Sequence, residues 1–132
     1  MKRLLFSAVF AAFFLTLSSC ALTEQSLRDK GISPLSQSEL QALYARPRTI
    51  QGTSAAGDRV TGSYTPEGMA KLQWSNGGAE GSWRIKDGKF CTTYSTLRGG
   101  EERCFTVYKT GDNEYKSFNP DSSLNVTASY TN

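Results

Sequence analysis

The sequence contains no histidine, and only three of its 132 residues are cysteine. Without histidine, a serine or cysteine nucleophile needs a lysine or a carboxylate as its base, and neither Ser-x-x-Lys nor Gly-x-Ser-x-Gly occurs in the chain. Histidine-containing zinc sites are excluded as well, and no acidic stretch matches a calcium-binding loop. We therefore expect a protein that is not an enzyme and that needs no metal and no cofactor. The enzymatic alternative is a hydrolase that uses two carboxylates.

The chain has little excess charge once its N-terminus is set aside. It carries fifteen basic and twelve acidic residues, and two of the basic ones, Lys2 and Arg3, stand before an apolar run. Without these two, thirteen basic residues face twelve acids, which is a formal net charge of +1. The basic residues are scattered among the acids, as on an ordinary solvated surface. Nucleic acid is therefore not an expected partner.

A long apolar run occurs only near the N-terminus. Between Leu4 and Leu17, only Ser7 and Thr16 interrupt the apolar side chains. This length is typical of the apolar region of a secretory signal and is short of the roughly 20 residues that a membrane-spanning helix needs. We predict that residues 1–19 are a signal peptide.

The run ends in Leu17-Ser18-Ser19-Cys20, which resembles the lipobox of bacterial lipoproteins. The resemblance implies that the mature chain begins at Cys20, with a diacylglyceryl group and an N-acyl chain that anchor it stably in a membrane. The alternative is an ordinary signal peptide with an incidental cysteine. Ala21 stands where an aspartate would signal inner-membrane retention. We therefore expect an outer-membrane lipoprotein, on the periplasmic or the surface face, whose partners are the membrane and an envelope or host protein.

The two other cysteines, Cys91 and Cys104, form an even pair. In an oxidising envelope compartment such a pair is expected to form a disulfide. If the two cysteines lie opposite each other on adjacent antiparallel strands, Phe90 faces Phe105, and Thr96–Gly99 becomes a four-residue loop. The phenylalanines then share the inner face of the sheet, and the disulfide lies on the outer side or at the rim.

The residues after the anchor divide into a tether and a helix. Residues 20–35 show no clear period and are predicted to be a membrane tether with at most a short helical turn. Ser36 and Glu39 have the spacing of a capping box, and Pro47 disfavours helical geometry just before it, so a short helix is predicted over residues 36–45. Its apolar face consists of Leu40, Leu43 and Tyr44. Such a face most often covers one end of a neighbouring domain.

From Thr49 onward the apolar residues alternate with polar ones, which is typical of strands with one buried face. Gly-rich and Asn/Asp-Gly turns recur at intervals of roughly ten residues. We predict an all-β domain over residues 36–132, which consists of the helix and an antiparallel meander of about eight strands. A meander of this length usually curls into a barrel or a tight sandwich, since closure removes exposed edges. Of the two we expect a small lipocalin-like barrel.

Residues 81–91 and 104–112 are similar to a group of uncharacterised small secreted bacterial proteins. The shared features are a Gly-x-Trp strand at Gly81 and Trp83, an Asp-Gly turn at Asp87, and a paired-cysteine hairpin. The resemblance implies a fold and a compartment and carries no activity. Gly-x-Trp strands also occur in lipocalin-like and avidin-like barrels, which is an architectural analogy alone.

Aromatic residues in the predicted strands are the other candidates for a functional role, through contact with a ligand. A barrel this small is expected to fill its interior with its own side chains. The predicted structural core comprises Trp83, Phe90, Phe105 and Val107. The candidates for contact with a ligand, inside the barrel or at its rim, are Tyr64, Trp74 and Tyr94.

The expected function is that of an envelope binding module for a protein or a small ligand. Envelope barrels of this size with one disulfide include inhibitors of host lysozyme, which makes that role the most concrete version of the hypothesis. The first alternative is a structural or assembly lipoprotein of the outer membrane without a ligand cavity. The second is the carboxylate-dependent hydrolase.

Overall fold

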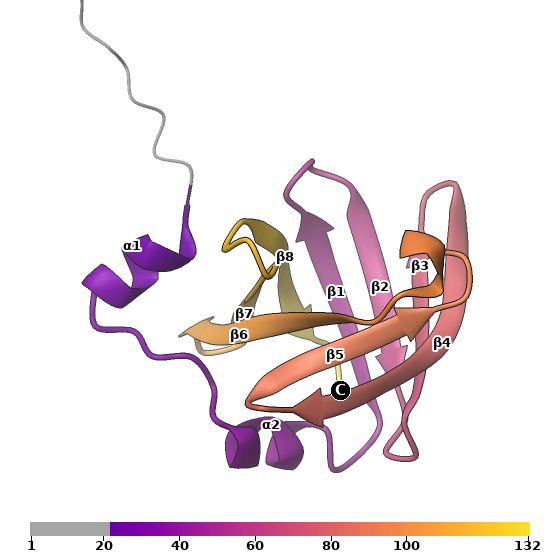
Figure 1. Cartoon of the computed structure of the whole chain (residues 1–132), viewed down its shortest axis with the longest axis horizontal. Coiled ribbons are helices and arrows are strands. Elements are labelled where there is room, and N and C mark those ends of the chain that lie inside the picture. Colours follow the sequence, from indigo (N-terminus) through magenta and orange to yellow (C-terminus); the bar gives the residue numbers. More distant parts are fainter. Residues whose placement is uncertain (1–21) are drawn as a thin grey trace, which may run out of the picture.

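Eight strands, each hydrogen-bonded to the next along the chain, form a closed antiparallel barrel in the computed structural model, which describes residues 22–132 (Figure 1). The last strand pairs with the first and closes the barrel. The strands are β1 (Arg48–Ser54), β2 (Arg59–Tyr64), β3 (Met69–Trp74), β4 (Gly77–Lys86), β5 (Lys89–Tyr94), β6 (Arg103–Gly111), β7 (Glu114–Phe118) and β8 (Leu124–Tyr130). The predicted all-β meander barrel is confirmed. The predicted signal peptide and Cys20 lie outside the described residues.

The strands end where turn residues allow the chain to reverse. Between β4 and β5, Asp87 and Gly88 both have positive φ (53° and 72°), as a two-residue hairpin turn of the favoured hand requires. Because side chains alternate across a strand, Tyr64 and Ala70 face the interior and are buried, while their neighbours Ser63 and Lys71 are exposed. The alternation that the sequence predicts is therefore the inward-outward alternation of a barrel wall.

The ladder between β5 and β6 is short, and the disulfide lies in its middle. Only three pairs are in register, namely Phe90 with Phe105, Cys91 with Cys104, and Thr92 with Arg103. By contrast, six pairs join β4 to β5. The predicted disulfide and the predicted register around it are confirmed. Beyond this short ladder, β6 is hydrogen-bonded to the segment before α2: the N–H of Leu35 donates to the carbonyl of Val107 at 2.8 Å.

The predicted four-residue loop at Thr96–Gly99 is wrong. Pairing ends at Thr92, and the connection to β6 is longer and contains a 3₁₀ turn, η1 (Arg98–Gly100). Arg98, Gly99 and Gly100 all have positive φ, a conformation that cannot continue a β-ladder. The Arg98 guanidinium also donates a hydrogen bond of 3.1 Å to the carbonyl of Thr92, the last residue of β5 that pairs with β6.

A helix closes one end of the barrel, as the sequence predicts. Helix α2 (Gln37–Leu43) begins at the Ser36 N-cap, where the Ser36 and Glu39 side chains form a complete capping box. Leu40 is fully buried and Tyr44 is 6% exposed, so both side chains join the barrel core. Figure 1 shows α2 beneath the end of the barrel at which the β4–β5 hairpin turns.

A second helix, α1 (Glu24–Asp29), lies where a tether with at most a short helical turn was expected. Leu27 of this helix is 3% exposed and packs with Tyr108 and Phe118 on the outer side of β6 and β7 (Figure 1). The helix is six residues long, too short to be stable without such contacts. Within residues 22–132, two helices therefore precede the barrel instead of the one predicted, and this part of the tether is docked on the barrel wall.

Candidate functional site

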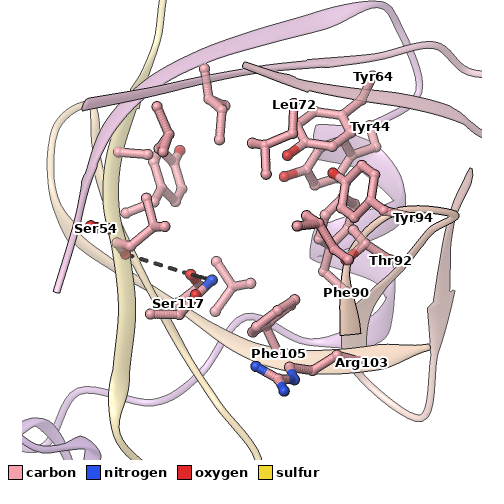
Figure 2. A pocket seen from close by; sticks show the side chains of 18 of the residues that line it. Tyr44, Ser54, Tyr64, Leu72, Phe90, Thr92, Tyr94, Arg103, Phe105 and Ser117 are labelled. Carbon is pink, nitrogen blue, oxygen red and sulfur yellow. Dashed lines mark hydrogen bonds between the residues drawn. The ribbon is translucent and has the colours of Figure 1, made fainter. Parts of the chain in front are cut away.

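The interior of the barrel is not filled by its own side chains. It contains a cavity of about 310 Å³, within the range of small-molecule sites. Figure 2 shows the lining side chains arranged around an empty centre. The lining residues are Tyr44, Ile50, Ser54, Val60, Tyr64, Leu72, Phe90, Thr92, Tyr94, Leu97, Arg98, Arg103, Phe105, Val107, Tyr115, Ser117, Asn125, Val126, Ala128 and Tyr130.

The expectation of a filled interior was wrong, because the inward-facing side chains leave a cavity beside a group of aromatic rings. The large aromatic rings come mainly from α2, β2, β5 and β6, and Figure 2 shows Tyr44, Tyr64, Tyr94 and Phe90 grouped on one side. Small side chains, such as those of Ser54 and Ala128, face inward from β1 and β8. Tyr115 on β7 and Tyr130 on β8 also line the cavity, and the Tyr130 hydroxyl meets that of Tyr44. These rings together leave the remaining interior space empty.

An aromatic floor closes the cavity at the α2 end and consists of Tyr44, Tyr64, Phe90 and Trp83. The Tyr44 ring stacks on Phe90 with centroids 4.5 Å apart, and Tyr64 meets Phe90 edge to face at 5.2 Å. Trp83 lies behind them, 5.2 Å from Tyr44, and its indole N–H donates to the Thr65 carbonyl at 2.8 Å. Such packing holds the floor rigid.

The absence of a side chain at Gly62 makes room for one of these rings. A Cβ at this position would lie 2.6 Å from the Tyr64 hydroxyl and 3.0 Å from the Ile50 side chain. Both distances are too short for non-bonded atoms. Gly62 therefore lets the Tyr64 ring lie against the strand and point its hydroxyl toward the cavity, as Figure 2 shows.

The tyrosine hydroxyls of the interior remain protonated. The Tyr130 hydroxyl donates to the Tyr44 hydroxyl at 2.9 Å. Burial raises the pKa values of Tyr44 and Tyr64 well above their ordinary value and raises the pKa of Tyr130 to about 12. At neutral pH these groups are uncharged hydrogen-bonding groups around a mostly apolar space.

The end of the barrel opposite α2, the arginine end, carries the guanidinium groups of Arg98 and Arg103. Nη2 of Arg98 donates to both the carbonyl and the hydroxyl oxygen of Thr92, each at 3.1 Å. The same guanidinium lies 5.8 Å from the Tyr94 ring centroid and 5.7 Å from that of Phe105, within the range of cation–π contact. Arg103 is exposed although it lines the cavity, so the cavity reaches solvent at this end.

The arginine end of the cavity carries positive charge without a paired carboxylate. Burial lowers the pKa of Arg98, and the positive charge of Arg103 lowers it further. Within residues 22–132, neither arginine forms an ion pair with a carboxylate. The remaining residues, 1–21, contain no aspartate or glutamate. The protein therefore supplies positive charge at this end without a contacting counterion of its own.

The opposite wall of the cavity carries a small polar pair. The Asn125 amide donates to the Ser117 hydroxyl at 3.2 Å, which is the dashed line in Figure 2. The Ser117 hydroxyl in turn lies 3.5 Å from the Val126 carbonyl. These groups satisfy one another, so this wall is less able to bind a charged group than the arginine end.

The cysteine bridge lies on the outer side of the wall, away from the cavity. Cys91 is completely buried, and Arg84, which lies opposite it on β4, forms a two-pronged ion pair with Glu102 at 2.6 and 2.7 Å. In the described part of the chain, Cys91, Glu102 and Cys104 are the one group of potential metal ligands close together. The disulfide and the ion pair occupy all three.

The structure brings only some of the predicted site residues together. Tyr64 and Tyr94 line the cavity, whereas Trp74 is half-buried beside Gly77 and does not. Of the predicted core residues, Trp83 is half-buried behind the floor. The remaining three are buried and also line the cavity, and they are Phe90, Phe105 and Val107.

Sequence reasoning missed Tyr44, Arg98 and Arg103 as cavity residues. Tyr44 was expected to cover one end of the domain but not to line a space. Arg98 was expected to belong to a turn. For Arg103 a signal was present, because it shares strand parity with Phe105 and Val107 and must face the same side.

Comparisons of the chain with known protein families, with curated protein sequences and with solved structures find no match. A function for this chain must therefore be argued from its own residues. Neither of the helices in residues 22–132 is long and apolar enough to cross a lipid bilayer.

Proposed function

We propose that the chain is a lipid-anchored binding protein of the bacterial cell envelope that holds a small, largely apolar ligand inside its barrel. The observation that carries the proposal is the cavity of about 310 Å³, lined mainly by aromatic and aliphatic side chains with a few polar groups. Natural ligand sites have this composition, because apolar surface supplies affinity and a few polar groups fix orientation. Empty apolar space also costs stability, so a retained cavity favours a binding role.

The anchor is the second part of the proposal and rests on the sequence. The charged N-terminus, the apolar run and Leu17-Ser18-Ser19-Cys20 support lipidation of Cys20 and an outer-membrane location. Intact mass of protein extracted from native membranes tests it: the expected species begins at Cys20 and carries two or three acyl chains. Cys20→Ser is the matched control and should remain unlipidated. An unprocessed wild-type chain would contradict the anchor and the envelope location.

Ligand binding is tested with decan-1-ol as an uncharged apolar probe. Equilibrium dialysis of the radiolabelled alcohol against the full chain in lipid nanodiscs measures uptake, and empty nanodiscs give the background. Leu72→Trp fills the cavity, because Leu72 points into it (Figure 2), and should abolish the excess uptake. Met69→Trp adds the same ring on the same strand at a 65% exposed position and should leave uptake unchanged.

The alternatives lead to different results. If wild type and Leu72→Trp take up the alcohol equally, the cavity binds nothing, and a structural or protein-binding role, including the lysozyme-inhibitor-like one, replaces ligand binding. The carboxylate hydrolase has no support at this site, because no aspartate or glutamate is among the residues that line the cavity.

A further inference from the structure

The arginine end presents charge where a buried apolar space meets solvent. Arg98 is half-buried and Arg103 is exposed, and both line the cavity. Within residues 22–132, the acids that form ion pairs do so with other basic residues, for example Glu102 with Arg84, and neither Arg98 nor Arg103 has an ion-pair partner. Asp121 interacts with Arg103 only weakly, because the pKa of Asp121 is lowered mainly by its hydrogen bonds from Ser123 and only slightly by the charge of Arg103.

Arg98 has hydrogen-bonding capacity that the protein does not use. Its Nη2 nitrogen donates to Thr92, while Nε is buried and has no hydrogen-bond partner among residues 22–132. Buried polar groups without a partner are rare, and each one calls for an explanation. Nε and Nη2 form the edge through which a guanidinium binds a carboxylate, as Arg84 binds Glu102. In Arg98 the Nη2 nitrogen of this edge already donates to Thr92, so Nε is the donor of the edge that is left for an anionic ligand.

The guanidinium is also held in place before anything binds. Thr92 fixes one nitrogen, and the ring centroids of Tyr94 and Phe105 lie less than 6 Å from the guanidinium carbon. A side chain that is already ordered loses little conformational entropy when a ligand arrives. A buried cation beside a second cation is costly, so an anion between them would stabilise both.

From these observations, and resting on the proposed binding function, we propose that the ligand is a single-chain amphiphile. Its small anionic head lies between Arg98 and Arg103, and its apolar chain extends toward the aromatic floor. At about 30 Å³ for each water-sized group, the cavity of about 310 Å³ has room for a chain of roughly ten groups. The head is a carboxylate or a phosphate ester, which share the chemistry that a guanidinium recognises.

The test compares ligands that differ only in the head group. Decanoate, decyl phosphate and decan-1-ol are dialysed, each below its micellar concentration, against the full chain in nanodiscs. Wild type should bind at least one anion about tenfold or more tightly than the alcohol, which is the scale of charge-assisted hydrogen bonds. The preferred anion then distinguishes a free acid from a phosphate ester, and a preference for either supports the proposal.

Arginine variants show where the anion lies. Arg103→Gln should remove most of the preference for the anion over the alcohol, and Arg98→Lys should weaken it because the Nε donor is lost. Arg59→Gln is the matched control, because Arg59 is exposed at the same barrel end but does not line the cavity. Partition into the nanodisc lipid is the same for all variants, so differences between them report the barrel.

The outcomes separate this inference from the proposed function. If the alcohol binds as tightly as both anions, the barrel is a ligand carrier but the head-group proposal is wrong. It is also wrong if the preference survives both arginine variants, because the anion then lies elsewhere. If none of the three ligands shows uptake that Leu72→Trp abolishes, the proposed function fails and the inference fails with it.

Discussion

The ring of Tyr44 stacks on the ring of Phe90 with centroids 4.5 Å apart and planes inclined by 15°. This contact joins α2 to the barrel and forms the closed end of the cavity, so the helix is part of the binding site and not a separate cover. The Tyr44 hydroxyl is also bonded to Tyr130 on β8, so one side chain links three elements that are far apart in sequence.

We expect Tyr44→Ala to destabilise the barrel strongly. Loss of a buried aromatic ring costs about 3–5 kcal/mol of unfolding free energy, and Tyr44 is only 6% exposed. Tyr44→Phe keeps the ring and loses only the hydroxyl bond to Tyr130, which is worth about 1 kcal/mol. Urea unfolding of both variants measures the difference. If Tyr44→Ala were no less stable than Tyr44→Phe, the stacking on Phe90 would not support the barrel.

At Gly81 the backbones of β4 and β5 lie very close together. A Cβ at this position would collide with the Thr93 carbonyl of the neighbouring strand. Gly81→Ala should therefore cost about 1–3 kcal/mol or more, as overpacking generally does. Gly77→Ala on the same strand is the matched control, since its Cβ would meet the Trp74 ring at an ordinary 3.5 Å. Equal melting temperatures for the two variants would show that β4 moves away from β5 at no cost.

The disulfide joins the two strands whose ladder is shortest, so its loss should open the barrel at this point. Cys91 and Cys104 are 13 residues apart, and closing a loop of that size contributes about 3 kcal/mol. Cys91→Ala/Cys104→Ala should lower unfolding stability by this amount and speed amide exchange in β5 and β6 ahead of β2 and β3. Reduced wild-type protein should behave in the same way. Uniform loss of protection across all strands would indicate that no local opening occurs.

The parts of this fold that sequence predicted are those that depend on local signals. Alternation, Asp87-Gly88 and the spacing of the cysteines are sufficient to define the strands and the disulfide register. Helix α1 was missed because its burial depends on Tyr108, which is 84 residues from Glu24 along the chain. The cavity could not be predicted, because it results from large and small side chains meeting across a closed barrel. Arg98 belongs to the same class, since only the folded loop places it over Tyr94 and Phe105.

Docking of α1 should depend on pH through Glu24, which is 5% exposed. The Tyr108 hydroxyl donates to its carboxylate at 2.8 Å, and Arg28 pairs with the same oxygen at 2.7 Å. Burial acts to raise the pKa of Glu24, but hydrogen bonds from Tyr108, Ser122 and Arg28 hold it below its ordinary value of 4.5. A group whose pKa is lowered by folding stabilises the fold above the unfolded pKa and ceases to do so as pH falls through the folded one.

Amide exchange at Ile32, whose N–H donates to the Leu27 carbonyl at 3.0 Å, measures whether α1 is docked. Relative to amides of β3, we expect Ile32 to be protected at neutral pH and to lose protection as pH falls below 4.5 and Glu24 becomes protonated. Glu24→Gln cannot ionise, so its Ile32 protection should be weaker at neutral pH and should not change across this range. Tyr108→Phe removes the hydroxyl donor and should move the wild-type transition to higher pH. An Ile32 profile that is the same in wild type and Glu24→Gln would mean that α1 is held by Leu27 packing alone.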